Sequence, residues 1–246
     1  MTQGSITLAL GDSTDLTNSV PSDSVALVLT DPPYGLGLFT KSRGNNLQGL
    51  RAGYFSDEPW EQFGDGEWDR LIDKTLRNAS RIVAQRGAIV LFAPIFKIET
   101  VKRLAEKYDL YYKTTGIWHK TNPMPRNKNL HFINATEHWT YLIKGGRTGT
   151  FNNDGRVQHD IITLPTAPKA ERVFGKHPTQ KPKMLMRHFI SLLSNPGDLV
   201  FDPFMGSGTT GVAALELGRR FFGYELNQEY FNIASARITA QMECQK

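Results

Sequence analysis

Short apolar runs alternate along this chain with segments of helical periodicity, and this alternation leaves few folds open. Apolar runs at 6–10, 25–29 and 88–92 have the length and composition of strands that are covered on both faces. Apolar residues recur at helical spacing over 68–83 and again over 95–104. Because strands and helices that alternate in this way build parallel sheets, we expect an α/β fold.

The same pattern returns toward the C-terminus, after a middle section of different character. Residues 112–118 and 137–143 are rich in Thr, Ile, Trp and Tyr, and no helix is expected between them, so they predict an antiparallel pair at a sheet edge. Beyond them we expect helices at 185–193, 212–217 and 227–242, the last capped by Asn227, and strands at 198–201 and 220–224. Two glycine- and proline-containing segments, 35–66 and 145–176, read as loops.

Composition narrows the class of protein. A chain of 246 residues with 39% hydrophobic and 22% charged residues predicts one domain, spanning 1–246. No apolar run approaches the roughly 18–20 residues that cross a bilayer, and no secretory signal precedes the first strand. The single cysteine, Cys244, and six histidines without ligand spacing argue against disulfides and a bound metal. We expect a cytoplasmic protein without membrane contact.

Charge is distributed unevenly along the chain. Residues 113–187 contain 13 Lys and Arg against 4 Asp and Glu, whereas the rest of the chain is slightly acidic. Aromatic residues are interleaved with these basic residues. A basic stretch on a near-neutral body is typical of a polyanion binder, and the aromatics favour nucleic acid over a merely solvated lysine-rich face.

Asp31-Pro32-Pro33-Tyr34 follows the apolar run at 25–29. Each proline removes a backbone N–H and fixes φ, and Pro32 keeps Asp31 out of helical geometry. The resulting stiff turn can direct a carboxylate, a peptide carbonyl and an aromatic ring into one cleft. Those groups suit a planar base that is held by its amino group and its face, although four residues alone also fit a proline-rich strand cap.

A second motif, Phe201 to Gly211, joins a predicted strand to a predicted helix. Its glycines allow a backbone to approach a ligand, and the helix N-terminus beyond offers free N–H groups. Glu225 lies 17 residues after Gly208, at the end of the next strand, where an acid can bind ribose hydroxyls. The spacing also fits a dinucleotide fingerprint, so an NAD enzyme stays open. Only 21 residues follow Glu225, so further strands of the sheet must come from the N-terminal half, in circularly permuted order.

The chain resembles the S-adenosylmethionine-dependent DNA amino-methyltransferases of the permuted, or beta, group. Asp31 to Tyr34 is similar to the catalytic motif of that family, and Phe201 to Thr210 to its cofactor motif. His177-Pro-Thr-Gln-Lys-Pro182 and Trp118-x-Lys-x-Asn-Pro123 also match family segments. The resemblance implies a Rossmann-like, mostly parallel sheet of seven strands with one antiparallel strand, in circularly permuted methyltransferase order.

The resemblance also implies roles for individual residues. Asp31, Pro32, Pro33 and Tyr34 would be catalytic, binding the exocyclic amino group and stacking on a flipped-out base. S-adenosylmethionine would be bound by Asp12, Thr179, Lys181, Asp202, Phe204, Gly206, Ser207, Gly208, Thr209, Thr210 and Glu225. Double-stranded DNA would be contacted by loops at 36–66 and 121–176, with candidate residues Lys41, Arg43, Arg51, Lys120, Arg126 and Lys128.

Several interpretations remain open at this point. Asp at the first motif position accompanies adenine N6 methylation in the family, and cytosine N4 methylation is the nearest alternative. A non-catalytic nucleic-acid-binding relative is a third. Methylation at a cytosine ring carbon would need a cysteine nucleophile, and Cys244 lacks that context. The recognition sequence, a role in a restriction-modification system and the choice between monomer and homodimer are not determined by these residues.

Overall fold

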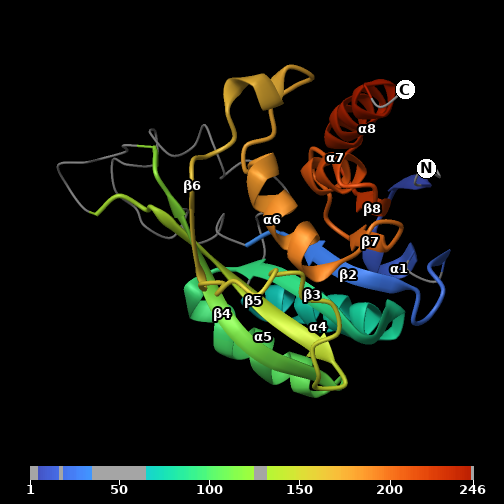
Figure 1. Cartoon of the computed structure of the whole chain (residues 1–246), viewed down its shortest axis with the longest axis vertical. Helices are drawn as coiled ribbons and strands as arrows, with labels where there is room; N and C mark the ends of the chain where they lie inside the picture. Colours follow the sequence, from blue (N-terminus) through green and yellow to red (C-terminus); the bar gives the residue numbers. More distant parts are fainter. Residues whose placement is uncertain (1–4, 17–18, 35–64, 125–131, 245–246) are drawn as a thin grey trace.

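One eight-stranded sheet forms the centre of the molecule in the computed structural model, which describes residues 5–16, 19–34, 65–124 and 132–244 (Figure 1). Every strand runs in the same direction except β5, which is antiparallel to both of its neighbours. In spatial order the strands are β1 (Ile6–Leu10), β8 (Arg220–Glu225), β7 (Leu199–Asp202), β2 (Val25–Thr30), β3 (Val83–Ala93), β5 (Thr136–Lys144), β4 (Leu110–Lys120) and β6 (Ile161–Leu164).

The predicted α/β class and the single antiparallel strand are confirmed, but the prediction of seven strands was wrong by one. The additional strand, β6, lies in the segment 145–176 that was expected to be a loop, and that segment also contains the short helix η4 (Lys169–Arg172). Strands β4 and β5 pair antiparallel as expected. They are not the sheet edge, because β6 pairs with the free side of β4 through residues 117–120.

Helices cover both faces of the sheet. The apolar stripe of α4 (Asp65–Ile82) and that of α5 (Ile98–Glu106) pack on one face. On the other face lie α6 (Lys183–Leu193), α7 (Thr209–Glu216) and α8 (Gln228–Glu243), and the side chain of Asn227 caps α8 as predicted. The central strands are buried almost throughout, because each face contacts a helix layer. No helix within the described ranges is long and apolar enough to cross a membrane.

The two ends of the described chain meet at one side of the sheet. Strand β1 pairs in parallel with β8, from Ile6 opposite Phe221 to Leu10 opposite Glu225. The backbone N–H of Gly11 then donates to the carbonyl of Glu225 at 2.9 Å. This arrangement is consistent with the permuted order, since strands from both ends of the sequence complete one half of the sheet.

The motif-bearing strands β2 and β7 are neighbours at the centre of the sheet. The chain leaves β7 toward α7 on one face and leaves β2 toward α4 on the other, which makes their carboxyl ends a topological switch point. Ligands bind at such points in open α/β sheets. Because β5 runs in the opposite direction, its first residues, Thr136 and Glu137, lie at this same edge.

Candidate active site

A tryptophan of α4 anchors the turn that follows β2. The indole Nε1 of Trp68, a buried residue in the first turns of α4, donates to the carbonyl oxygen of Pro33 at 2.9 Å. The ring of Tyr34 packs against the core beneath α6 and α7. The proline turn is therefore anchored at both its backbone and its aromatic side chain, and Asp31 is carried on a rigid support.

The carboxylate of Asp31 belongs to a row of alternating charges. Lys181 Nζ contacts Asp31 Oδ2, and it also lies 2.9 Å from Glu137 Oε2. The second oxygen of Glu137 is 2.7 Å from Lys120 Nζ. We call these four residues the carboxylate–lysine cluster; they come from the turn after β2, from β5, from the segment before α6 and from the end of β4.

Burial and mutual charge shift the ionisation of this cluster. Burial raises the pKa of Asp31, the neighbouring Lys181 ammonium opposes that rise, and the charge of Glu137 adds to it. Burial would lower the pKa of Lys181, but the carboxylates of Asp31 and Glu137 outweigh it and hold that pKa above its ordinary value. Burial also disfavours ionised Glu137, yet Lys181 and Lys120 lower its pKa below the ordinary value. The Lys181 ammonium is therefore held in its charged form between the two carboxylates, which oppose the effect of burial.

One oxygen of Asp31 is available. Oδ2 is engaged by Lys181, whereas the buried Oδ1 has no hydrogen-bond partner of good geometry in the described part of the chain; a hydrogen bond from the Tyr34 side chain also acts to lower the pKa of this carboxyl. A buried acceptor without a partner is costly in a folded protein and is found where a ligand supplies the donor. The geometry thus prepares one carboxylate oxygen for an N–H group from outside the protein.

The glycine motif forms the neighbouring half of the site. Gly206 has φ +51°, and a Cβ placed there would lie 3.0 Å from Nε2 of His177. Its N–H donates to Oε2 of Glu225 at 2.9 Å. Gly208 serves packing instead, since its Cβ would lie 2.9 Å from the Cβ of Ala234 in α8.

Asp202, predicted to bind the cofactor, is directed into the protein. Its Oδ1 accepts from the hydroxyl of Thr30 at 2.8 Å and the N–H of Phe204 at 3.1 Å, and its Oδ2 accepts from Thr210 at 2.6 Å. Burial raises the pKa of Asp202 to about 7, although these hydrogen bonds favour the ionised form. Asp202 and Thr210 therefore link β2, β7 and α7 by hydrogen bonds within the protein, and their side chains do not point into the site.

A buried arginine holds the glycine motif from α8. Nη1 of Arg237 donates to the carbonyl of Ser207 at 2.6 Å, to the Ser207 hydroxyl at 2.9 Å and to the Thr209 hydroxyl at 2.9 Å. Only 6% of Arg237 is exposed. Ser207 and Thr209 thus shape the turn through this arginine, and their hydroxyls are occupied.

Glu225 and Asp12 end two adjacent strands at the outer part of the site. Glu225 Oε1 accepts from the N–H of Asn227 at 2.8 Å, and burial raises the pKa of Glu225 against the effect of its backbone hydrogen bonds. The exposed Asp12 accepts from the N–H of Thr14 at 2.8 Å. Both carboxylates retain lone pairs for a ligand, because each oxygen can accept two hydrogen bonds.

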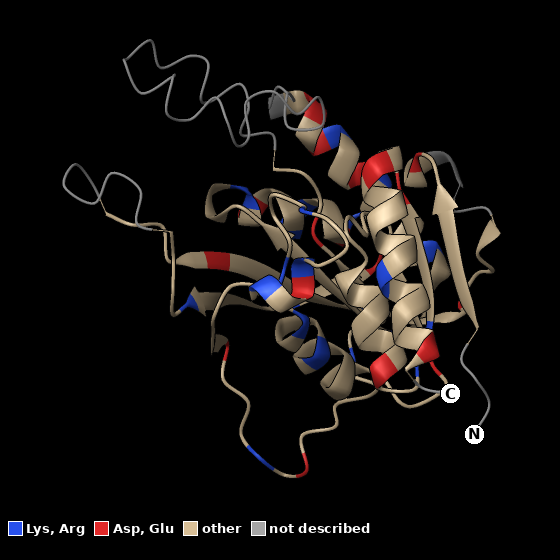
Figure 2. Cartoon of the chain, turned by 90° about the horizontal axis from the view of Figure 1, so that it is seen from above, with Lys and Arg blue, Asp and Glu red and all other residues tan. Residues whose placement is uncertain are grey.

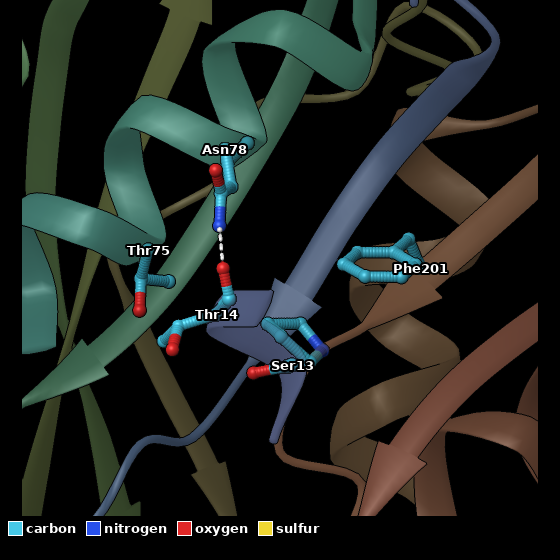
Figure 3. Close-up of a pocket in the computed structure, with 7 residues that line it drawn as sticks. Ser13, Thr14, Thr75, Asn78 and Phe201 are labelled. Atoms are coloured by element: carbon cyan, nitrogen blue, oxygen red, sulfur yellow. Dashed lines mark hydrogen bonds between the residues drawn. The ribbon is translucent and has the colours of Figure 1, made fainter. Parts of the chain in front are cut away.

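The Asp12 turn is fastened to α4. Asn78 Nδ2 donates to the carbonyl of Thr14 at 3.1 Å, which Figure 3 shows beside a cavity of about 10 Å³. Ser13, Thr75 and Phe201 also line that cavity. It is large enough for about one water molecule, so it contributes to the support of the site and is not the substrate pocket.

His177 packs against Gly206 of the glycine motif, and its side chain is neutral. Its ring lies 4.3 Å from that of Tyr230, centroid to centroid, and its Nδ1 lies 3.3 Å from the hydroxyl of Thr179. Burial, with the charges of Lys181 and Arg237, lowers the pKa of His177 to about 3. The histidine therefore adds no charge next to Gly206 at neutral pH.

Asp202, Ser207, Gly208, Thr209 and Thr210 support the glycine turn from within the protein, and Asp12 lies at the outer part of the site. The other predicted site residues divide into three groups. Asp31, Tyr34, Gly206 and Glu225 lie at the carboxyl edge of the central strands as expected, with Thr179 and the half-buried Phe204 beside them. Lys181 and Lys120 are part of the carboxylate–lysine cluster, although they were expected at the cofactor and at DNA. Five candidates lie outside the described residues: Lys41, Arg43, Arg51, Arg126 and Lys128.

Sequence reasoning missed three residues of the site. Glu137 was placed in a strand, Trp68 in the apolar repeat of a helix, and Arg237 only within the bounds of the last helix, with no role given to any of the three. A charge within an otherwise apolar strand was the signal for Glu137. The other two interactions join residues that are distant in sequence and have no local signature.

Comparison with known proteins finds matches over nearly the whole chain. A family model described as DNA methylase matches residues 25–236. The Type II methyltransferase M.HinfI of Haemophilus influenzae is 30% identical, over 94% of this chain and 68% of its own length. The Type II methyltransferase M2.DpnII of Streptococcus pneumoniae is also 30% identical, over 96% of this chain and 90% of its own.

A solved structure matches the fold closely. The crystal structure of the M1.HpyAVI–SAM complex superposes with a TM-score of 0.73 and 28% identity, covering 95% of this chain and 98% of that one.

Proposed function

The chain belongs to the DNA methylase family, and from this premise we propose that it transfers the methyl group of S-adenosylmethionine to the exocyclic N6 amino group of an adenine in double-stranded DNA. The observation that carries the proposal is the available Oδ1 of Asp31 at the switch point of the sheet, next to the glycine motif. A DNA methylase needs an acceptor for an amino group beside a site for a methyl donor, and these two features provide it.

The residues present fit S-adenosylmethionine. Gly206 adopts the left-handed region and its Cβ position is closed by His177, so no larger residue fits at this turn, which is hydrogen-bonded to Glu225. Glu225 and Asp12 offer carboxylates for the ribose hydroxyls and the adenine, and the free N–H groups at the start of α7 suit the methionine carboxylate. When bound, the cofactor supplies an electrophilic methyl group on a sulfonium.

Asp31 makes the target nitrogen reactive. An exocyclic amino nitrogen is a poor nucleophile because its lone pair is delocalised into the ring. A hydrogen bond to Asp31 Oδ1, with a second to the carbonyl of Pro32, favours a pyramidal nitrogen and stabilises the positive charge that develops during attack. Tyr34 stacks on the base, which must leave the duplex at a cost of a few kcal/mol to reach this turn.

Adenine is favoured over cytosine by the residue that begins the catalytic motif. Among members of this family Asp at that position accompanies adenine, and Ser accompanies cytosine, so Asp31 supports N6 methylation. The two relatives M.HinfI and M2.DpnII are both Type II methyltransferases, which supports a role in a restriction-modification system.

DNA contact is assigned to the segments 36–66 and 121–176, within a single methyltransferase domain spanning 1–246. The second segment is built from β5, β6 and η4 with their connections. Figure 2 shows basic residues on η4 and α6, with one acidic residue, Glu171, on η4, whereas acidic residues lie toward both ends of α8. The basic side therefore suits the phosphate backbone, which dominates affinity for DNA. The enzyme would act in the cytoplasm, as a monomer or homodimer.

Nucleoside mass spectrometry tests the proposal. Unmethylated duplex DNA is incubated with the purified protein and S-adenosylmethionine, then digested and analysed. N6-methyladenine is the expected product. N4-methylcytosine would retain the mechanism and overturn the base assignment, and the absence of any methylated base would contradict the proposed activity.

A further inference from the structure

Lys181 lies beside the catalytic carboxylate, but the proposed methyl transfer gives it no role. This lysine is 7% exposed and lies between two carboxylates, those of Asp31 and Glu137. A catalytic Asp paired with one buried lysine would be largely neutralised. The second carboxylate must therefore change what Asp31 can do.

We infer that Glu137 is a positioning residue for methyl transfer, which holds the Lys181 ammonium on Oδ2 of Asp31 and draws part of its charge away. This inference rests on the proposed function. Glu137 contacts neither the base nor the methyl donor in this account, and it acts through Lys181. Its effect is to leave Oδ1 of Asp31 both free and strongly basic toward the amino group.

The geometry supports this division of charge. Lys181 Nζ is 2.9 Å from Oε2 of Glu137, which is an ion pair of ordinary length. The other oxygen of Glu137 is held by Lys120 at 2.7 Å, so the glutamate is fixed from both sides. Two carboxylates and two ammonium groups balance, and a buried cluster of this kind avoids an uncompensated charge.

Without Glu137, Lys181 would pair with Asp31 alone. A carboxylate that is fully compensated by an ammonium is a weaker hydrogen-bond acceptor and stabilises less of the positive charge that develops on the attacked nitrogen. The same loss removes the negative charge that raises the pKa of Asp31. Both changes lower the basicity of Asp31, so they act in one direction.

Other ionisable groups also face this cluster, and they define what a pH experiment must hold constant. They are Tyr34 on the catalytic turn, Asp202 at the end of β7, His177 before α6 and His138, which follows Glu137 in β5. A substitution at Glu137 leaves all four side chains in place.

The test compares Glu137→Gln with the wild type. The amide preserves size and one hydrogen-bond acceptor but removes the charge. We expect the maximal rate of methyl transfer to fall roughly tenfold, which is part of the value of one charged hydrogen bond. The acidic limb of the pH–rate profile should move to lower pH, because Asp31 then loses its proton more easily.

Asp23→Asn is the matched control. Asp23 forms an ion pair of 2.7 Å with Lys144, at the far end of the same strand β5, so its loss removes a carboxylate–lysine contact away from the site. The rate and the acidic limb should both stay at their wild-type values in this variant. An unchanged acidic limb in Glu137→Gln would overturn the inference, even if its rate fell, because a merely structural role predicts that result.

A titration without DNA separates this inference from the proposed activity. Carbon-13 NMR of aspartate-labelled protein, with the Asp31 signal assigned through Asp31→Asn, reports the pKa of Asp31 directly. We expect that pKa to be lower in Glu137→Gln than in the wild type, whether or not DNA is methylated. If Glu137→Gln does not fold, Glu137→Asp withdraws the carboxylate from Lys181 and should shift the pKa of Asp31 in the same direction; no shift would refute the inference.

Discussion

The two halves of the site are held together by different forces. Around the glycine motif, a turn is fixed by directional hydrogen bonds that Asp202 and Glu225 accept and Arg237 donates. Around Asp31, the carboxylate–lysine cluster relies on ion pairs between long side chains from four separate segments. The first half presents backbone to a ligand, whereas the second presents a charged oxygen.

This difference matches the two tasks of a DNA methylase. A methyl donor of constant shape is best held by a rigid backbone turn, because rigidity reduces the entropy lost on binding. An acceptor that must respond to developing charge is best tuned by nearby charges. Substitutions in the glycine half should therefore alter cofactor affinity, and those in the Asp31 half should alter rate and pH dependence.

Arg237→Met should produce the largest effect within the glycine half. It leaves the carbonyl of Ser207 and the hydroxyl of Thr209 without their buried donor. We expect the free energy of unfolding to fall by about 2–3 kcal/mol and the affinity for S-adenosylmethionine to fall about tenfold, or ~1.4 kcal/mol. Denaturant unfolding and calorimetry measure the two quantities.

Arg219→Met is the control for that variant. Arg219 is equally buried and donates to Ser194 and Leu217 at the opposite edge of the sheet. It should lose comparable stability while keeping wild-type affinity for the cofactor. A similar loss of cofactor affinity in both variants would mean that the effect of Arg237 is general and not local.

Asp202 predicts a pH dependence of stability. Its pKa is about 7 in the folded protein against 3.8 as the ordinary value, so the folded state binds more protons between these limits. The free energy of unfolding contributed by this group is therefore highest below pH 4 and falls as the pH rises through 7. His177, with its pKa lowered to about 3, acts in the opposite direction over much of the same range.

The difference between wild type and Asp202→Asn isolates the aspartate. Urea unfolding across pH 4 to 8 should show that the variant lacks the decline assigned to Asp202, so its stability relative to wild type increases with pH. A relative stability that does not change with pH would show that Asp202 is ionised throughout this range.

Trp68→Phe, in the Asp31 half of the site, should have the smallest effect of these variants. It removes the hydrogen bond to the carbonyl of Pro33 while keeping an aromatic ring, at a cost of about 1 kcal/mol in the free energy of unfolding. The rate of methyl transfer should also fall a few-fold, because the turn that carries Asp31 is less well fixed.

Trp118→Phe provides the comparison. The indole of Trp118 donates to the carbonyl of Leu164 at 3.0 Å, which joins β4 to β6 and not to the turn after β2. Phenylalanine keeps an aromatic ring beside Lys120, whose Nζ lies 5.4 Å from the centroid of the Trp118 ring. Stability should fall by a similar amount, and the rate at saturating cofactor should not change. If the rate fell equally in both variants, the anchor under Pro33 would have no special role in catalysis.

Much of this molecule is predictable from local patterns. Apolar runs located the central strands, helical periodicity located α4 to α8, and the proline turn and glycine motif identified the family. The cap at Asn227 was predictable because its signal lies within three residues of the helix start.

The remaining features depend on contacts between distant segments. β6 has only four residues and is a strand because β4 offers it a free edge. Lys181 was assigned to the cofactor, but the partner that determines its position, Glu137, lies 44 residues earlier in a different strand. Arg237 is buried only because α8 packs over the glycine motif. Such pairings arise from tertiary packing, which a single sequence does not encode locally.

The most direct test of this account measures single-turnover methyl transfer by Asp31→Asn over a range of S-adenosylmethionine concentrations. The amide keeps the shape of the carboxylate but weakens it as an acceptor. We predict a maximal rate lower by about 10²–10³-fold, with half-saturation by the cofactor unchanged. A wild-type maximal rate, or a loss that appears only as weaker cofactor binding, would contradict the assignment of chemistry to Asp31.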